Sequence, residues 1–372
     1  MFPRVTLLYR LLAVCVSVTI IMILLQSVDD RINHKPLTYL PAYVKHSMRE
    51  IDSYGDQGIG NYSNATAQVT SLTTMHPPVN PHNFNFVVNP TTFCSSTRPE
   101  YVVYVHSAPK NHKKRQMVRQ TWGAKSVCNK YNMRVVFIMG LVSDQKVMNT
   151  VKLESNTYGD LVIEDFDDSY RNLTYKAIAG LKWVSKYCSD VKYVIKSDDD
   201  ILIDMHALMD QLNSTEVKSY GTRNVIMCNQ WLRMKVIRDK SSKWYISKEE
   251  FPDDFFPPYC SGSVFIMTSD VVQRMYWASL QTKFFWVDDF YITGLLVKRI
   301  GIEHKRLNEN YMLNARAAME KFNGDVKHEL RFFHVRKLVD VYKMWNTLEK
   351  NQNTSCSDCY TWTPPKFVNS TS

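Results

Sequence analysis

An apolar strand runs into three carboxylates in the stretch Val194-Ile195-Lys196-Ser197-Asp198-Asp199-Asp200-Ile201. If strand geometry persists, Asp198 and Asp200 point to the same side, because side chains two apart share a face. Two carboxylates placed in this way suit Mg²⁺ or Mn²⁺, which often bridge to substrate phosphates. Ligands also tend to bind at strand ends in α/β sheets. The alternative is an acidic turn that caps the next helix, so the rest of the chain must decide between the two.

Strands and helices are expected to alternate around this motif. We expect strands at residues 101–105, 134–139, 160–163 and 192–196, and later at 225–227 and 263–267. Helices are expected over 115–122 and 172–187, the second with its apolar residues on one stripe. This alternation predicts an α/β domain with a largely parallel sheet, which becomes mixed and rich in loops towards its end.

The composition is that of a folded protein with a basic surface. The chain has 372 residues and a net charge of +10, with 45% hydrophobic and 22% charged residues, which is ordinary for a globular protein. Its basic residues are scattered, apart from those in 110–115, and no nucleic-acid motif accompanies them. We therefore expect anionic partners or an anionic surface, and no nucleic acid.

The N-terminal segment is expected to anchor the chain in a membrane. An apolar run over residues 11–25 has arginines before it and aspartates after it, which places the N-terminus in the cytosol. We assign 1–10 to a cytoplasmic tail and 11–28 to a signal anchor, whose short span suits early secretory membranes. A cleaved signal peptide is the alternative, although the residues after the run make a poor cleavage site.

The rest of the chain is expected in the lumen. Residues 29–96 are polar and rich in proline, so they are predicted to form a disordered stem, before a catalytic domain at 97–350 and a polar tail at 351–372. Glycosylation sequons stand at Asn61, Asn64, Asn172, Asn213, Asn353 and Asn369. Seven of the eight cysteines follow the apolar run, and most would pair in an oxidising compartment, with a connectivity that the sequence does not give.

A second acidic pair stands in Phe285-Trp286-Val287-Asp288-Asp289-Phe290-Tyr291. Asp288 is a plausible N-cap for the helix that follows, and capping would account for one carboxylate. A carboxylate beside aromatic rings at a helix start can also act as the general base for a substrate hydroxyl.

Three further features each allow a structural and a functional interpretation. Gly262 either lets backbone approach a ligand or forms a plain tight turn. Arg115 and Arg119 share a helical face, where they either clamp a diphosphate or point into solvent. His334 lies in an apolar stretch, as a structural histidine or as a second ligand to a metal held by Asp200.

Taken in order, these blocks resemble the β1,3-glycosyltransferases, the Golgi family of β1,3-galactosyl- and β1,3-N-acetylglucosaminyltransferases. The matching blocks lie at 115–123, 137–140, 164–174, 196–200, 257–262 and 288–294. The resemblance covers about residues 97 to 345, and six ordered blocks are more specific than any one of them. The anchor, stem and sequons agree with it.

The resemblance implies a GT-A fold, which is a Rossmann-like nucleotide-sugar domain, and inverting transfer from a UDP-sugar to give a β1,3 linkage. By position it implies Asp200 and His334 as ligands of Mn²⁺ or Mg²⁺, and Asp289 as the base that deprotonates the acceptor hydroxyl. The implied nucleotide-sugar contacts are Arg115, Arg119, Asp198, Asp199, Gly262 and Asp288. Within the acidic motif, Asp199 is expected to point away from the metal.

The chain departs from the family pattern near the implied base. The family usually has Glu-Asp-Val where this chain has Asp288-Asp289-Phe290, and Phe290 is expected to add bulk on the acceptor side. The segment 257–262 is closer to the galactosyltransferase branch, which favours UDP-galactose as the donor.

We therefore expect a single-pass type II Golgi membrane enzyme that transfers a hexose to an oligosaccharide on glycoprotein or glycolipid, with its oligomeric state open. The alternatives are a UDP-N-acetylglucosamine- or UDP-N-acetylgalactosamine-dependent enzyme with the same machinery, a metal-dependent phosphohydrolase, and an inactive glycan-binding homologue. A two-metal phosphohydrolase would need more clustered ligands, and an inactive homologue would be expected to lose Asp200 or Asp289.

Overall fold

The computed structural model describes residues 77–322 and 329–352 of the chain. The predicted cytoplasmic tail and anchor, most of the predicted stem and nearly all of the polar tail lie outside these ranges, as do the sequons at Asn61, Asn64, Asn353 and Asn369. Within the two described ranges, no helix is both long and apolar enough to cross a membrane.

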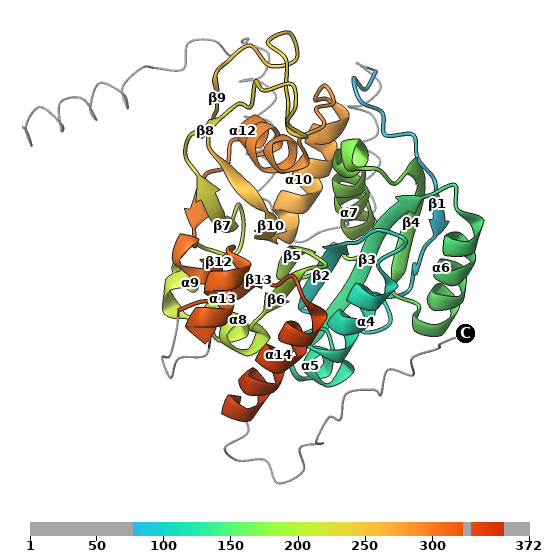
Figure 1. Ribbon diagram of the computed structural model, residues 1–372, viewed down its shortest axis with the longest axis vertical. Coiled ribbons are helices and arrows are strands. Elements are labelled where there is room, and N and C mark those ends of the chain that lie inside the picture. The colour runs from blue at the N-terminus through green and yellow to red at the C-terminus, as the bar shows by residue number, and fades with distance from the viewer. Residues whose placement is uncertain (1–76, 323–328, 353–372) are drawn as a thin grey trace, which may run out of the picture. The chain divides into compact units, whose positions relative to one another are not determined.

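An eight-stranded mixed sheet forms the centre of the fold, in the order β1-β4-β3-β2-β5-β10-β7-β11 (Figure 1). Its strands are β1 (Phe86–Val88), β2 (Tyr101–His106), β3 (Met133–Leu141), β4 (Leu161–Asp167), β5 (Tyr193–Asp198), β7 (Ile226–Trp231), β10 (Tyr259–Thr268) and β11 (His304–Arg306). The four strands from β4 to β5 in this order are parallel, whereas β1 and β10 run antiparallel to their neighbours β4 and β5. The predicted α/β fold with a sheet that becomes mixed is confirmed.

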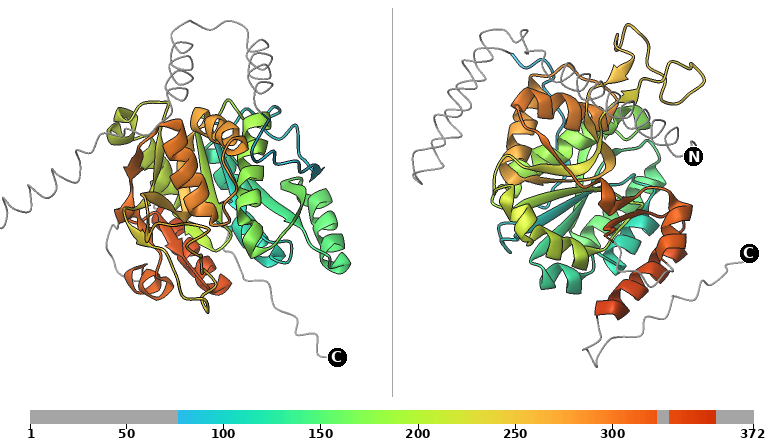
Figure 2. Two further views of the ribbon diagram at one scale, coloured as in Figure 1. Left: turned by 90° about the horizontal axis from the view of Figure 1, so that it is seen from above. Right: turned by 90° about the vertical axis from the view of Figure 1, so that its left-hand side faces the viewer.

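Helices cover both faces of the sheet (Figure 2). Alternate residues of the buried strand β2 contribute to two separate hydrophobic cores, since Val103 and Val105 lie in one and Val102 and Tyr104 in the other. The first core also contains residues of α4 (His112–Gln120), α5 (Lys125–Lys130), α6 (Gln145–Tyr158), α8 (Met205–Leu212), α9 (Thr215–Ser219), α13 (Ala315–Phe322) and α14 (Leu338–Gln352). The second contains residues of α7 (Leu173–Tyr187), α10 (Ser269–Leu280) and α12 (Val297–Ile300).

A small second sheet extends the acidic motif. Its three strands, in the order β12-β13-β6, are β6 (Ile201–Ile203), β12 (Tyr311–Met312) and β13 (Phe332–His334). Because β13 runs antiparallel to β6, His334 lies opposite Ile201, the residue that follows the three aspartates. A hairpin of β8 (Met234–Lys235) and β9 (Phe255–Phe256) frames a long loop.

The predicted stem boundary at residue 96 is wrong, because residues 77–96 are part of the fold. Strand β1 pairs with β4 at the edge of the main sheet, and Cys94 forms a disulfide with Cys188. His82 and Glu164 form a fully buried pair with 2.8 Å between Nε2 and Oε2. A second disulfide joins Cys228 to Cys260, and Cys128 is buried and unpaired.

A fragment that begins at residue 97 is therefore expected to be less stable than one that begins at residue 77. The shorter fragment loses the Cys94–Cys188 disulfide and leaves Glu164 buried without its histidine, and a native disulfide alone contributes about 2–5 kcal/mol. Urea unfolding of both secreted fragments measures the difference. A Cys94→Ser variant of the longer fragment separates the disulfide from the remaining contacts, and equal midpoints for both fragments would contradict the expectation.

The two sequons in the described ranges differ in accessibility. Asn213 is exposed at the C-terminal end of α8, which suits a glycan. Asn172 is half-buried and its amide donates to the carbonyl of Asp167, while Thr174 of the same sequon is fully buried.

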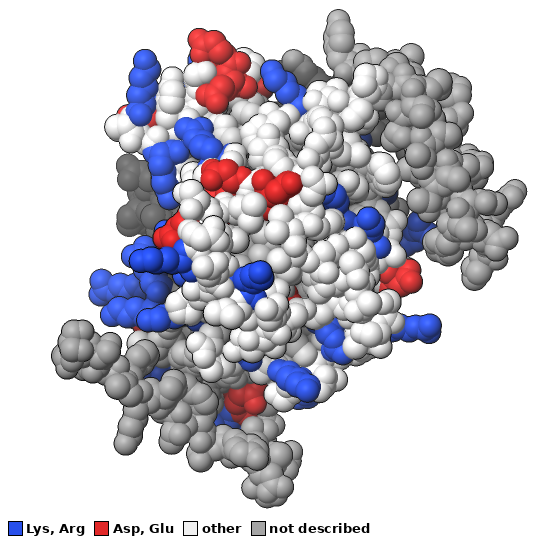
Figure 3. Space-filling model, turned by 90° about the vertical axis from the view of Figure 1, so that its right-hand side faces the viewer, with Lys and Arg blue, Asp and Glu red and all other residues white. Residues whose placement is uncertain are grey.

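Charge is distributed over the surface without one dominant patch on the face that Figure 3 shows. Lys and Arg side chains are dispersed between wide uncharged areas, with one group at an edge of this view. This agrees with the scattered basic residues of the sequence.

Candidate active site

The acidic motif lies where the order of the main sheet changes direction. From β2 the chain moves outward to β3 and β4, and then returns to place β5 on the other side of β2. The carboxyl ends of β2 and β5 therefore lie side by side, with His106 opposite Asp198. In open α/β sheets, ligands bind at this kind of switch point.

The side chain of Asp199 is buried, unlike those of Asp198 and Asp200, and its contacts connect the elements around it. Its buried carboxylate accepts hydrogen bonds of 2.8 Å from Ser107 Oγ, Asn111 Nδ2 and Lys114 Nζ. These contacts join the loop after β2 and the start of α4 to the end of β5. Since both carboxylate oxygens are engaged, Asp199 supports the site from behind rather than facing a ligand.

Asp200 and His334 are brought together by the pairing of β6 with β13. Asp200 keeps 35% of its side chain exposed and accepts a 3.1 Å hydrogen bond from Lys114 Nζ. The backbone N–H of Val335 donates to the Asp200 carbonyl. His334 Nδ1 lies 3.2 Å from the carbonyl of Leu313, so a proton on Nδ1 leaves the Nε2 lone pair free.

Asp200 and His334 can supply only part of the ligands that a divalent cation needs. Within the described ranges, no group of three or more His, Cys, Asp and Glu side chains is placed to hold a metal. Asp200 offers an oxygen and His334 a nitrogen, and Mg²⁺-type ions commonly take their remaining ligands from water and substrate phosphates. The donor set therefore suits a cation shared with a bound diphosphate.

Lys196 connects the acidic motif to the second acidic pair. Its buried ammonium lies 2.6 Å from Asp198 Oδ1 and also donates to the carbonyl of Gly262. Burial raises the pKa of Asp198 to about 6, although Lys196 opposes the shift. A Cβ atom on Gly262 would lie 3.0 Å from the Cβ of Asp289, so glycine allows the close approach of this carboxylate.

The carboxylates of Asp288 and Asp289 both lie in the first turn of α11 (Asp288–Phe290). Val287 occupies the N-cap position, so the alternative of Asp288 as the N-cap is wrong. Burial, followed by repulsion from Asp288, raises the pKa of Asp289 to about 7. Burial also raises the pKa of Asp288, against the positive charge of Lys196. One carboxylate of this pair is thus suited to accept a proton near neutral pH.

The residues after this pair hold it against β10. The Thr293 hydroxyl donates to the Asp289 carbonyl at 2.6 Å and accepts the Cys260 N–H at 2.9 Å. Thr293 belongs to a π-helical turn, η3 (Tyr291–Leu296), a conformation that often occurs at functional sites. The position of Asp289 beside Gly262 is therefore fixed from both sides.

Phe290 does not add bulk on the acceptor side, so that expectation is wrong. The side chain is fully buried and packs against Phe256, with 4.4 Å between the ring centroids, and against Tyr259. The ring fills a third hydrophobic cluster behind the acidic pair.

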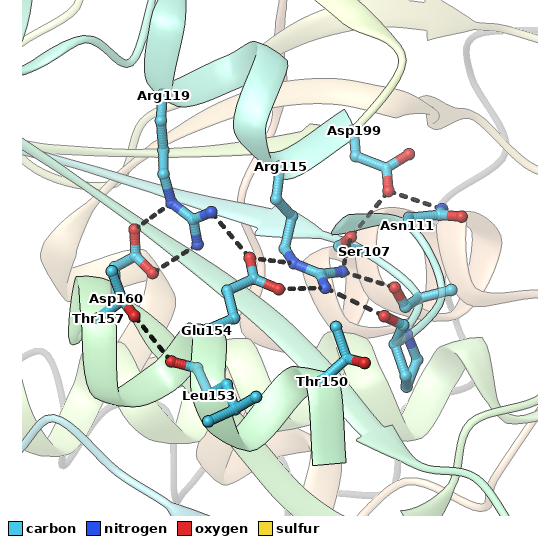
Figure 4. A network of polar contacts seen from close by, with 12 residues as sticks. Ser107, Asn111, Arg115, Arg119, Thr150, Leu153, Glu154, Thr157, Asp160 and Asp199 are labelled. Atoms are coloured by element: carbon cyan, nitrogen blue, oxygen red, sulfur yellow. Dashed lines mark hydrogen bonds and ion pairs between the residues drawn. The ribbon is translucent and has the colours of Figure 1, made fainter. Parts of the chain in front are cut away.

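Arg115 and Arg119 lie in a buried polar network instead of pointing towards a ligand (Figure 4). A guanidinium has five N–H donors, and Arg115 uses all of them on Glu154, Ser107 and the carbonyls of Ala108 and Pro109. Arg119 forms a two-bond pair with Asp160 and a third bond with Glu154. In this geometry Arg115 has no free donor with which to form the predicted diphosphate clamp. It donates instead to Ser107, whose hydroxyl in turn donates to Asp199.

Four polar residues at the site were not identified from the sequence. Lys114 lies between Asp199 and Asp200, and Lys176 donates to the Ser107 carbonyl and to Asp168 Oδ1. In the described structure the hydroxyl of Tyr104 and Nε2 of His106 are buried without a hydrogen-bond partner. Burial raises the pKa of Tyr104, and the negative charge of Asp288 adds to this shift. Burial lowers the pKa of His106, and the positive charge of Lys196 adds to that shift. For Tyr104 and His106, polar side chains at alternate positions of the otherwise apolar strand β2 were the available signal.

Comparison with known proteins gives consistent matches. The family model described as Galactosyltransferase matches residues 113–308. Beta-1,3-galactosyltransferase 1 of Mus musculus is 36% identical over 228 residues, which are 60% of this chain and 68% of that protein. Beta-1,3-galactosyltransferase 5 of Homo sapiens is 29% identical over 280 residues, which are 73% of this chain and 86% of that protein. A crystal structure of the galactosyltransferase LgtC with donor and acceptor sugar analogues covers 69% of this chain and 98% of its own at 9% identity, with a TM-score of 0.33, which is too low for a structural argument.

Proposed function

This chain belongs to the galactosyltransferase family, and we propose that it transfers galactose from UDP-galactose to a glycan acceptor in β1,3 linkage through a GT-A-type site. The observation that carries the proposal is the contact of Lys196 with both Asp198 and Gly262, next to Asp289. It joins the acidic motif to a half-buried carboxylate with a raised pKa. The site thus combines a place for a nucleotide diphosphate with a place for a base.

Asp289 is the proposed general base. Its pKa of about 7 lets it take the proton of an acceptor hydroxyl near neutral pH, which is where a general base is most effective. Asp288 keeps that pKa raised, while Lys196 limits the repulsion among the carboxylates. The fixed position of α11 against β10 keeps the base oriented towards the nucleotide-sugar side.

The opposite side of the site holds the leaving diphosphate. A divalent cation bound by Asp200 and His334 would neutralise negative charge on the departing group. Lys114 adds a positive charge at the same place, since its side chain is 31% exposed and its ammonium contacts both Asp199 and Asp200. Asp198 is the carboxylate that remains for the nucleotide-sugar itself.

We also propose a type II orientation in the Golgi membrane, with the described domain in the lumen. The apolar segment at 11–28 and the flanking charges support this orientation. Two disulfides in the described domain fit an oxidising compartment.

The test of the proposed function is a donor screen with the purified full chain. We expect transfer from UDP-galactose to a β-linked acceptor in the presence of Mn²⁺ or Mg²⁺, a β1,3 linkage in the product by NMR, and loss of transfer in EDTA. Asp200→Asn is expected to weaken Mn²⁺ binding, which can be measured separately by calorimetry with UDP present. Transfer from UDP-N-acetylglucosamine or UDP-N-acetylgalactosamine alone would change the donor, and equal transfer in EDTA would remove the metal role of Asp200.

A further inference from the structure

Two large aromatic side chains lie exposed next to each other, although they come from distant parts of the chain. Tyr170 is the first residue of η2 (Tyr170–Asn172), and Trp244 lies in the long loop between β8 and β9. Their exposed fractions are 46% and 51%. The ammonium of Lys243 lies 5.2 Å from the centroid of the Tyr170 ring and 4.4 Å from that of the Trp244 ring. The lysine therefore bridges the two rings by cation–π contacts.

This aromatic pair lies beside the proposed base. The Tyr170 ring is 6.5 Å from the ring of Trp286, which precedes Asp288 by two residues. The Thr174 hydroxyl donates to the Phe285 carbonyl at 2.7 Å, which fixes the start of α7 against the same segment. Burial raises the pKa of Tyr170, a hydrogen bond from Trp244 opposes this shift, and the charges of Asp288 and Asp289 add to it.

The loop that carries Trp244 is held in shape by one arginine. The guanidinium of Arg238 donates to four backbone carbonyls, those of Ile246, Ser247, Phe251 and Asp253, at 2.5–2.9 Å. The N–H of Ile246 also donates to the carbonyl of Ile237 at 3.0 Å. Ordering a loop in advance lowers the entropy that a ligand must overcome on binding.

The chemistry of this surface fits a sugar ring. A pyranose has one face of C–H groups, which packs on an aromatic ring, and hydroxyls around its edge, which accept hydrogen bonds. Trp244 and Tyr170 offer exposed rings of this kind, with the ammonium of Lys243 over both of them and the guanidinium of Arg171 over the neighbouring Trp286 ring. The ion pairs between described residues do not include Lys243 or Arg171. Sites for small polar ligands commonly combine an apolar surface with a few polar groups in this way.

We propose that Trp244 and Tyr170 form an acceptor subsite that stacks on a pyranose ring of the glycan acceptor and so selects the acceptor rather than the donor. This inference rests on the proposed function, because it uses the position of Asp289 as the base. The subsite lies next to the segment that leads to Asp289, through the contact of the Tyr170 ring with the Trp286 ring. It also gives a role to the loop between β8 and β9, whose sequence alone has no readable specificity.

The experiment compares two exposed tryptophans in the full chain purified in detergent. Trp244→Ala is expected to raise the KM for the acceptor by about 3- to 10-fold, which corresponds to about 0.7–1.4 kcal/mol and lies within the range of one aromatic contact. The KM for UDP-galactose and kcat at saturating acceptor are expected to change by less than about twofold. Trp244→Phe keeps a ring and is expected to restore most of the acceptor affinity. Trp277→Ala is the matched control, because Trp277 is 41% exposed on α10 and its ring lies next to that of Tyr276.

A binding measurement separates this inference from the proposed function. Acceptor glycans are expected to quench the tryptophan fluorescence of the wild type and of Trp277→Ala. The quenching is expected to be weaker in Trp244→Ala. An unchanged acceptor KM and unchanged quenching in Trp244→Ala would overturn the subsite. A raised donor KM with an unchanged acceptor KM would also overturn it. Absence of transfer by the wild type from any UDP-sugar would instead overturn the proposed function, whatever the quenching shows.

Discussion

Replacement of Asp289 by Asn is expected to lower kcat by more than about 10²-fold, with UDP affinity largely unchanged. The amide keeps the size and the position of the side chain beside Gly262 but cannot accept the proton of the acceptor hydroxyl. Initial rates with UDP-galactose and a β-linked acceptor give kcat, and calorimetry gives the dissociation constant for UDP. Asp190→Asn, which changes an exposed aspartate on the surface, is the matched control.

The pH profile of the wild type tests the same assignment. Burial and Asp288 raise the pKa of Asp289 to about 7, so the carboxyl is protonated and inactive as a base below that pH. Transfer is therefore expected to rise as pH increases through about 7 and then to level off. If Asp289→Asn transfers at the wild-type rate, or if the profile is flat between pH 6 and 8, another residue is the base.

Replacement of Arg115 by Ala is expected to lower the free energy of unfolding by about 3–5 kcal/mol, the usual cost of removing one partner from a buried ion pair. Arg115 is fully buried, and its loss leaves Ser107, the carbonyls of Ala108 and Pro109 and one side of Glu154 without their donors. Urea unfolding followed by circular dichroism measures the change. The control is Arg316→Ala, since among the described residues that exposed arginine forms its ion pair with Glu320 one turn away, which should contribute less than about 0.5 kcal/mol.

The same variant decides between two roles for Arg115. If Arg115→Ala keeps wild-type stability and only weakens UDP binding, the diphosphate clamp predicted from the sequence is right and the structural role is wrong. Arg115→Lys refines the comparison, because lysine keeps the charge but offers three donors instead of five. It is expected to be intermediate in stability between the wild type and Arg115→Ala.

Periodic apolar patterns predicted the strands around the site because buried strands leave a strong signal. Every residue of β2 is buried, and β5 ends at Asp198 next to the expected aspartates. The burial of the Asp199 side chain between two more exposed aspartates agrees with the alternation of side chains along a strand. Polar contacts between distant residues left no such signal. Glu154 lies in α6, which was not expected as a helix. The sequence also does not distinguish an arginine whose N–H donors are all hydrogen-bonded from one whose donors are free.

Errors at the edges of the fold have a similar physical cause. Strand β1 has three residues within a polar segment, and it is held by its pairing with β4 and by a disulfide whose partner lies at the end of α7. A local window records the polar composition but not these tertiary contacts. The side chain of Phe290 could likewise point to either side of α11, and only the presence of the third hydrophobic cluster directs it inward.

The disulfide between Cys228 and Cys260 links the site to the conditions under which the chain is made. Cys260 is separated by one residue from Gly262, and the pairing of β10 with β7 is irregular between Cys260 and Phe265. The covalent bond therefore holds these strands together where their hydrogen-bond ladder is interrupted, directly before the glycine that Asp289 approaches. Chain synthesised in a reducing host would lack this disulfide, so recombinant material from a bacterial cytosol is a poor reference for the activity of the disulfide-bonded protein.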